Sequence, residues 1–152
     1  SSGLFNSIRM TERQKLTLSQ KIAELQQLTK ALRLLQKKID RKRFLAEDFI
    51  RRAIERYLQL AIEATLDISD QIINEENLRK PAEYKDNILI LGEQGILPKK
   101  FAVRFSLAAG FRNILVHDYV RLDKEKVYEH FKKDATDIEK FIKAVLVYLK
   151  KH

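Results

Sequence analysis

Two side chains of this 152-residue chain, Arg112 and His117, stand five positions apart and could do chemistry together. A guanidinium is always charged and binds phosphate through paired N–H donors, and an imidazole can accept and release a proton near neutral pH. RNA carries its own nucleophile, the 2′-hydroxyl. Cutting it requires a base for that proton, an acid for the leaving 5′-oxygen and positive charge at the phosphate. Arg112 and His117 would supply these functions without a metal and leave a 2′,3′-cyclic phosphate.

The two residues do not form a complete site within one chain. A single histidine leaves either the base or the acid missing, whereas a symmetric dimer would bring two copies of each side chain together. On an ideal helix Arg112 and His117 point about 140° apart, so either the helix bends near Gly110 or the partner chain completes the site. Asn113 lies one turn before His117 and could hydrogen-bond the imidazole or the phosphate.

A predicted helix from about Lys99 to Tyr119 carries these residues and is apolar on nearly every side. One side holds Phe101, Phe105, Ala108, Leu115 and Val116 with Arg112 and Tyr119, a second holds Leu107, Phe111 and Ile114, and a seam holds Ser106, Gly110, Asn113 and His117. A helix without a solvated face must be covered by its own bundle and by something else, so we expect a two-fold homodimer across it. Gly110 costs about 1 kcal/mol relative to alanine, which indicates that a backbone or ligand comes close there.

Arg112 falls in the apolar stripe, and a buried guanidinium requires an anion because an unpaired charge out of water costs several kcal/mol. Two partners stay open: a carboxylate of the preceding helix, Glu63 or Asp67, or the phosphate of a ligand. The acidic strip to which these carboxylates belong consists of Gln59, Glu63, Asp67 and Asp70. We expect it to be a solvated face, with binding of a neighbour's arginines as the second interpretation.

The remaining apolar periodicity predicts an all-α fold, an antiparallel bundle of four long helices plus one short helix. The other long helices are expected at about residues 11–39, 47–74 and 123–149, and the short helix at 84–91, ending at Gly92. Asp123 is the expected N-cap of the last helix. The basic cluster at residues 37–43 is expected to be a solvated turn, with RNA contact as the second interpretation. His130, on a face expected to be exposed, and His152 receive no role.

The composition agrees with one folded domain. Hydrophobic residues make up 45% and charged residues 34%, and only 4 glycines and 2 prolines are present, which favours helices. With no cysteine, disulfides, thiolate zinc sites and cysteine nucleophiles are excluded. The net charge of +9 attracts polyanions such as nucleic acid. No apolar run approaches the ~20 residues of a membrane span, so we expect a cytoplasmic protein. We interpret residues 1–9 as a tag remnant and residues 10–152 as a single helical domain.

The segment Gly110-Phe111-Arg112-Asn113-Ile114-Leu115-Val116-His117-Asp118-Tyr119 resembles the signature of HEPN domains, in which arginine is followed by a polar residue and, after three more, by histidine. Tyr119, two residues past His117, is similar to the HepT-like toxin branch of that family. The resemblance extends through residues 54–64 and 91–98 and covers about residues 46–149.

This resemblance implies a dimeric HEPN-like bundle and a metal-independent endoribonuclease that needs no cofactor and acts as the toxin of a toxin–antitoxin pair. The implied antitoxin is a nucleotidyltransferase of the MNT type, which silences the nuclease by attaching AMP to Tyr119. Such a bulky anion beside Arg112 would neutralise its charge and fill the phosphate site. Without the family, Tyr119 would be interpreted as a core residue. The alternatives are a catalytically inactive HEPN module that binds RNA or a nucleotide or docks the nucleotidyltransferase, and a purely structural bundle.

Overall fold

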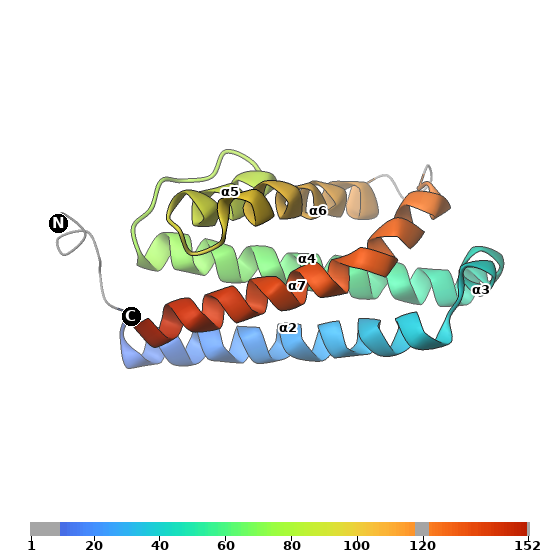
Figure 1. The fold of residues 1–152 in the computed structure, drawn as a ribbon, viewed down its shortest axis with the longest axis horizontal. Coiled ribbons are helices and arrows are strands. Elements are labelled where there is room, and N and C mark those ends of the chain that lie inside the picture. Colours follow the sequence, from blue (N-terminus) through green and yellow to red (C-terminus); the bar gives the residue numbers. More distant parts are fainter. Residues whose placement is uncertain (1–9, 118–121, 152) are drawn as a thin grey trace.

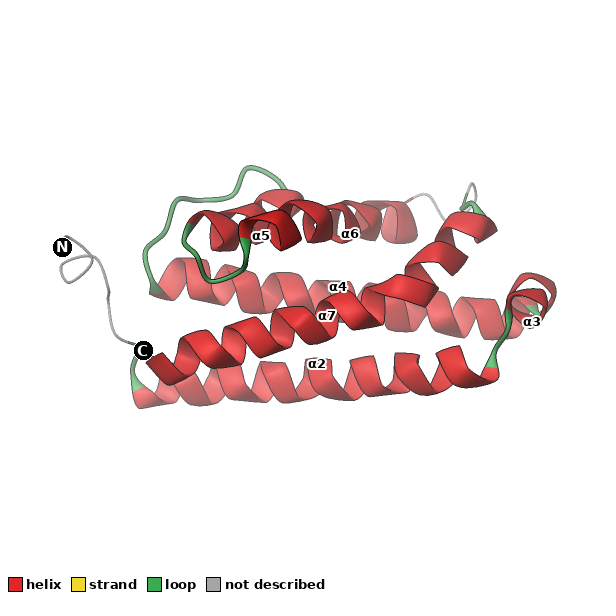
Figure 2. Cartoon of the chain, viewed as in Figure 1, coloured by secondary structure: helices red, strands yellow, loops and turns green. Residues whose placement is uncertain are grey.

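The computed structural model describes residues 10–117 and 122–151, and within these ranges it contains helices and connecting loops but no strand (Figure 2). The helices are α2 (Glu12–Lys38), α3 (Arg41–Ala46), α4 (Asp48–Glu75), α5 (Tyr84–Glu93), α6 (Lys99–His117) and α7 (Lys124–Lys151). The predicted all-α fold is confirmed. None of these helices is long and apolar enough to span a membrane within the described residues.

The four long helices α2, α4, α6 and α7 form an antiparallel bundle (Figure 1). α4 and α7 each pack against both α2 and α6, so α2 and α6 lie at opposite corners. The short helix α5 packs against α6 and α4. Phe105 of α6 and Phe141 of α7 meet in the core with their ring centroids 5.9 Å apart, which anchors the motif helix to the bundle.

Local hydrogen bonds explain where the helices begin. At the start of α2, Thr11 and Gln14 form a reciprocal capping box, with distances of 2.8 and 3.1 Å. Asp40 caps α3 by accepting a hydrogen bond from the Arg43 amide at 2.8 Å. The expected cap of the last helix is confirmed, since Asp123 accepts a bond of 3.0 Å from the second amide of α7.

The basic connection after α2 contains a short helix, so the expected turn is wrong, although its basic side chains are exposed to solvent as expected. Phe44 lies in the middle of this connection and is fully buried, with its ring stacked on Phe131 at 5.6 Å. The basic side chains keep to the outside, as in the ion pair of Arg43 with Glu47 at 2.6 Å. Burial of one aromatic ring together with the cap at Asp40 stabilises a helix where charge alone indicated a loop.

Gly92 does not end α5, contrary to the sequence expectation. The helix continues to Glu93, and the glycine with positive φ, 75°, is Gly95 in the following turn. A Cβ at Gly92 would lie 2.6 Å from the Cβ of Ala102, so Gly92 allows α5 and α6 to approach closely. This contact sets the distance between α5 and α6, the helix that bears Arg112 and His117.

Candidate active site

The motif helix α6 buries one side in the bundle. Phe101, Phe105, Ala108 and Leu115 are each 8% exposed or less. Arg112 shares this side, with 19% of its side chain exposed. The predicted position of a charge within the apolar stripe is therefore confirmed.

A second apolar stripe on α6, formed by Val103, Leu107 and Ile114, is uncovered in the single chain. These side chains are 62%, 67% and 40% exposed. Gly110 lies on the same side, and no atom of the described residues comes within 4 Å of the position that a Cβ would take there. The close approach expected at Gly110 thus does not come from the chain itself. Phe111, expected on this side, is instead buried at 3% exposure.

Arg112 pairs with Glu63 of α4. Its Nη2 lies 3.1 Å from the Glu63 Oε2, and its guanidinium lies 4.8 Å from the centre of the Tyr84 ring on α5. The Glu63 side chain is 32% exposed, so the pair stands at the edge of the core. Of the two carboxylates that the sequence left open, the structure selects Glu63 over Asp67.

A pocket of about 270 Å³ opens beside this pair, between α4, α5 and α6. Its lining residues are Glu63, Leu66, Asp67, Asp70, Tyr84, Asn87 and Arg112. Arg112 is the one cation among these lining residues. A phosphate group that binds Arg112 from this side must compete with the Glu63 carboxylate and approach two further carboxylates. The pocket therefore holds the guanidinium in place but does not by itself form an anion site.

The acidic strip on α4 is largely the solvated face that the sequence favoured, since Asp67 and Asp70 are exposed and Gln59 and Glu63 are half-buried. Its side chains nevertheless bind neighbouring helices. Glu63 binds Arg112, and Asp67 pairs with Lys21 of α2 at 3.1 Å. Asp70 accepts a hydrogen bond of 3.4 Å from Asn87 of α5. The second interpretation, in which the strip binds an arginine, is confirmed at Glu63.

The remaining candidate residues are Asn113, His117 and Tyr119. His117 is the last described residue of the helix, and its side chain falls outside the described part of the structure, as do Tyr119 and His152. Asn113, one turn earlier, is exposed. Within the described residues, no group of three or more His, Cys, Asp or Glu side chains is arranged to hold a metal ion.

His130 of α7 is not exposed, so the sequence expectation for it is wrong. Its side chain is 14% exposed, its Nδ1 lies 3.0 Å from the Asp134 Oδ2, and its ring stacks on Phe111 at 3.8 Å. Burial raises the pKa of the Asp134 carboxyl, although the hydrogen bond with His130 opposes this. The position of Asp134 in the sequence could have indicated this, because Asp134 continues the three-and-four spacing of the core residues Phe131 and Ile138.

Comparisons with known proteins connect these features to one family. A family model described as Ribonuclease HepT-like matches residues 18–145. The chain is 28% identical over 88 residues to the mRNA nuclease HepT of Shewanella oneidensis, which covers 58% of this chain and 66% of that protein. It is 34% identical over 94 residues to a putative RNase of Archaeoglobus fulgidus, covering 62% and 70% of the two chains. The chain thus spans just under two thirds of the Shewanella protein's length.

Solved structures share the fold along nearly the whole chain. The cytosolic protein YutE from Bacillus subtilis superposes with a TM-score of 0.78 at 22% identity, covering 90% of this chain and 91% of YutE. A tri-AMPylated Shewanella oneidensis HEPN toxin in complex with an MNT antitoxin superposes with a TM-score of 0.77 at 23% identity, covering 91% and 99%. At these identities the likeness establishes the shared fold.

Proposed function

The chain belongs to the HepT-like ribonuclease family, and on this basis we propose that it is a metal-independent endoribonuclease acting as the toxin of a toxin–antitoxin pair. The observation that carries the proposal is the environment of Arg112. This guanidinium is held at the edge of the core, 19% exposed, five residues before His117 on the same helix. A charge kept near the surface by one carboxylate and one aromatic ring can exchange that carboxylate for a phosphate.

In the proposed reaction His117 accepts the proton of the 2′-hydroxyl, whose oxygen forms a bond to phosphorus. The bond from phosphorus to the 5′-oxygen breaks, and that oxygen takes a proton from the His117 of a second chain. Arg112 donates N–H groups to the phosphate oxygens as negative charge builds up on them. Asn113, on the same side of α6 as His117, hydrogen-bonds the imidazole or the phosphate. The products are a 2′,3′-cyclic phosphate and a 5′-hydroxyl.

A homodimer across α6 would complete this site. The uncovered stripe of Val103, Leu107 and Ile114 supports it, because contiguous exposed apolar side chains on one helix are typical of an interface. On an ideal helix the position of His117 is about 60° from the centre of this stripe, whereas that of Arg112 is about 160° away. His117 would thus lie beside the two-fold contact. Arg112 would have to leave Glu63 to reach the same phosphate.

We further propose that a nucleotidyltransferase silences the nuclease by attaching AMP to Tyr119. The AMPylated Shewanella toxin in complex with its MNT antitoxin supports this assignment. Tyr119 follows Arg112 by seven positions in the sequence. The phosphate of the attached AMP would compete with RNA for Arg112.

One observation favours a second candidate, a catalytically inactive module that binds RNA or the nucleotidyltransferase. The guanidinium of Arg112 is already satisfied by Glu63 and Tyr84 and needs no ligand to be stable. The ribonuclease would cut the RNA that it binds, whereas the inactive module would leave it intact.

Incubation of the full chain with end-labelled RNA in excess EDTA tests the proposal. We expect cleavage with 2′,3′-cyclic phosphate ends, and none with the His117→Ala or Arg112→Ala variants, whose circular dichroism should match that of the parent. RNA that stays intact with excess parent protein would favour the inactive module. Cleavage that appears only after a divalent cation is added would contradict the metal-independent mechanism.

A further inference from the structure

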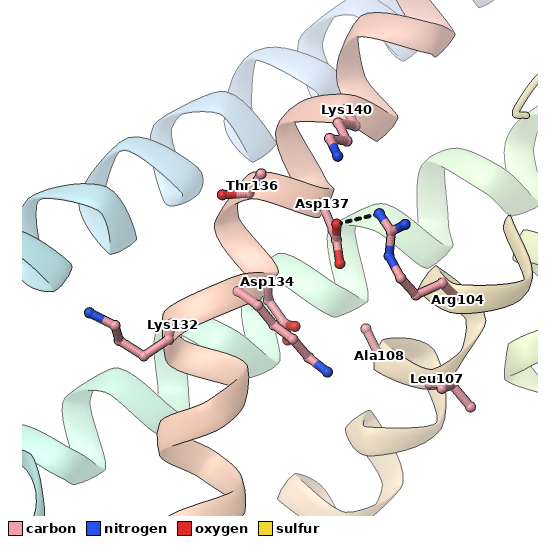
Figure 3. Close-up of a pocket in the computed structure, with 9 residues that line it drawn as sticks. Arg104, Leu107, Ala108, Lys132, Asp134, Thr136, Asp137 and Lys140 are labelled. Carbon is pink, nitrogen blue, oxygen red and sulfur yellow. Dashed lines mark hydrogen bonds and ion pairs between the residues drawn. The ribbon is translucent and has the colours of Figure 1, made fainter. Parts of the chain in front are cut away.

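A basic groove lies between α6 and α7 (Figure 3). It shares no lining residue with the Arg112 pocket. We define it as Arg104, Leu107 and Ala108 of α6 together with the lining residues of α7 between Lys132 and Lys140. Its volume is about 350 Å³, larger than the pocket beside Arg112. Nothing in the proposed cleavage step uses it.

The charges that the groove shows to solvent are positive. Lys132, Lys133 and Lys140 are exposed, and within the described residues none of them has an ion-pair partner. The two carboxylates that line the groove are both engaged. Asp137 accepts a hydrogen bond of 2.9 Å from Arg104, and Asp134 is fully buried beside His130. The lysines are therefore free to bind an anion.

Arg104 is held in position on the α6 wall. It reaches toward Asp137, with Lys140 one turn further along α7 (Figure 3). Its guanidinium also lies 5.2 Å from the centre of the Phe101 ring, yet 54% of its side chain stays exposed. A guanidinium has five N–H donors, so the bond to Asp137 leaves others available to a phosphate.

We propose that the basic groove binds the sugar–phosphate backbone of RNA at a distance from the bond that is cut, an inference that rests on the proposed ribonuclease function. Arg104 precedes Arg112 by eight residues, about 12 Å along the helix axis, so one phosphate group cannot contact both. The groove would bind a different phosphate of the same strand.

The spread of the cations indicates a polyanion rather than a single small anion. Lys133 and Lys140 are seven residues apart on α7, about 10 Å along its axis, and Asp137 lies between them. A single phosphate would meet that carboxylate, whereas a strand can place successive phosphates beside the separate lysines. Proteins that bind single-stranded nucleic acid use a groove of positive charge to follow its backbone.

The test is a charge-matched pair of double variants in the full chain. Lys133→Gln with Lys140→Gln alters the groove. Arg13→Gln with Lys30→Gln removes the same charge from exposed positions on α2, at the opposite corner of the bundle from α6. On an RNA long enough to reach both sites, we expect the groove variant to raise KM several-fold with kcat unchanged. A plot of the logarithm of its RNA-binding constant against the logarithm of the salt concentration should have a slope smaller in magnitude by about 1.4, because two phosphate contacts are lost.

A dinucleotide substrate sharpens the test, because its single phosphate occupies the cleavage site alone. All variants should cut it like the parent. Equal losses with the α2 control would show that only net charge matters and would overturn the proposal. So would a groove variant that binds and cuts long RNA like the parent while losing a nucleotidyltransferase partner, which would assign the groove to protein docking. If the parent does not cut RNA at all, the proposed function fails, but binding of intact RNA still tests the groove.

Discussion

Arg112 of α6 lies against Glu63 of α4, with Nη2 3.1 Å from Oε2, so the motif arginine is already bound to an anion when no RNA is present. Exchange of a carboxylate for a phosphate conserves the charge balance of the guanidinium. It also means that RNA binding has to overcome a protein contact. The strength of this contact therefore enters the KM of the proposed reaction.

Replacing Glu63 by glutamine should strengthen RNA binding. The partly exposed ion pair is worth about 1 kcal/mol, so loss of the competing charge should lower KM by up to about fivefold. Steady-state kinetics and RNA titration would measure this. Glu24→Gln on α2 is the matched control, because Glu24 is exposed and lies outside the Arg112 pocket. A fall in kcat in Glu63→Gln would instead show that Glu63 positions Arg112 for the reaction.

Replacing Arg112 by lysine should keep the charge but lose cleavage. A lysine cannot donate the paired N–H groups that a guanidinium directs at phosphate oxygens, so kcat should fall by about 10²-fold. Stability should change by about 1 kcal/mol or less, because the pair with Glu63 is partly exposed. Thermal unfolding and single-turnover cleavage would check both. An active lysine variant would remove Arg112 from the proposed site.

The uncovered stripe on α6 gives a prediction about assembly. Val103→Glu should convert a dimer into a monomer, because the interface would bury an unpaired carboxylate. Leu16→Glu on α2 is the control, since Leu16 is 59% exposed and Val103 is 62% exposed. Sedimentation velocity at micromolar concentration would distinguish the two variants. A parent protein that is monomeric under these conditions would refute the dimer.

The two helical glycines should respond differently to alanine. Gly92→Ala places a Cβ 2.6 Å from the Cβ of Ala102 and should cost about 1–3 kcal/mol in the free energy of unfolding. Gly110→Ala meets nothing within the chain and should make the helix up to about 1 kcal/mol more stable. If a partner helix approaches Gly110, the same variant should weaken the dimer. Urea unfolding and sedimentation would separate these effects, and a destabilised chain in Gly110→Ala would contradict the prediction.

The buried Asp134 should make stability depend on pH. Burial raises the pKa of its carboxyl above the unfolded value. Its contribution to stability is therefore fully present below the unfolded pKa and is lost as pH rises through the folded pKa. Asp134→Asn does not titrate. The unfolding free energy of the parent minus that of the variant should thus decrease as pH rises from below the unfolded pKa of this carboxyl through its higher folded pKa. An increase over this range would mean that the attraction to His130 outweighs burial.

The periodicity of apolar residues predicted the long helices well, because a stripe at three-and-four spacing must face a core wherever the helix packs. The cap at Asp123 was also predicted, because it depends on a local hydrogen bond, whereas the caps at Thr11 and Asp40 were found only in the structure. The helix α3 was missed because burial of Phe44 against Phe131, a contact distant in sequence, outweighs the charge of its neighbours.

The sequence by itself determined that the chain is an all-α bundle and that an arginine and a histidine of the HEPN signature stand on one apolar helix. Only the tertiary structure decided that Glu63 holds Arg112, that Asp134 and His130 pair beneath Phe111, and that lysines of α7 face Arg104 across a groove. Spacing along one helix sets which side chains share its face. Which side chains meet across helices depends on how those helices pack, and long-range burial sets that packing.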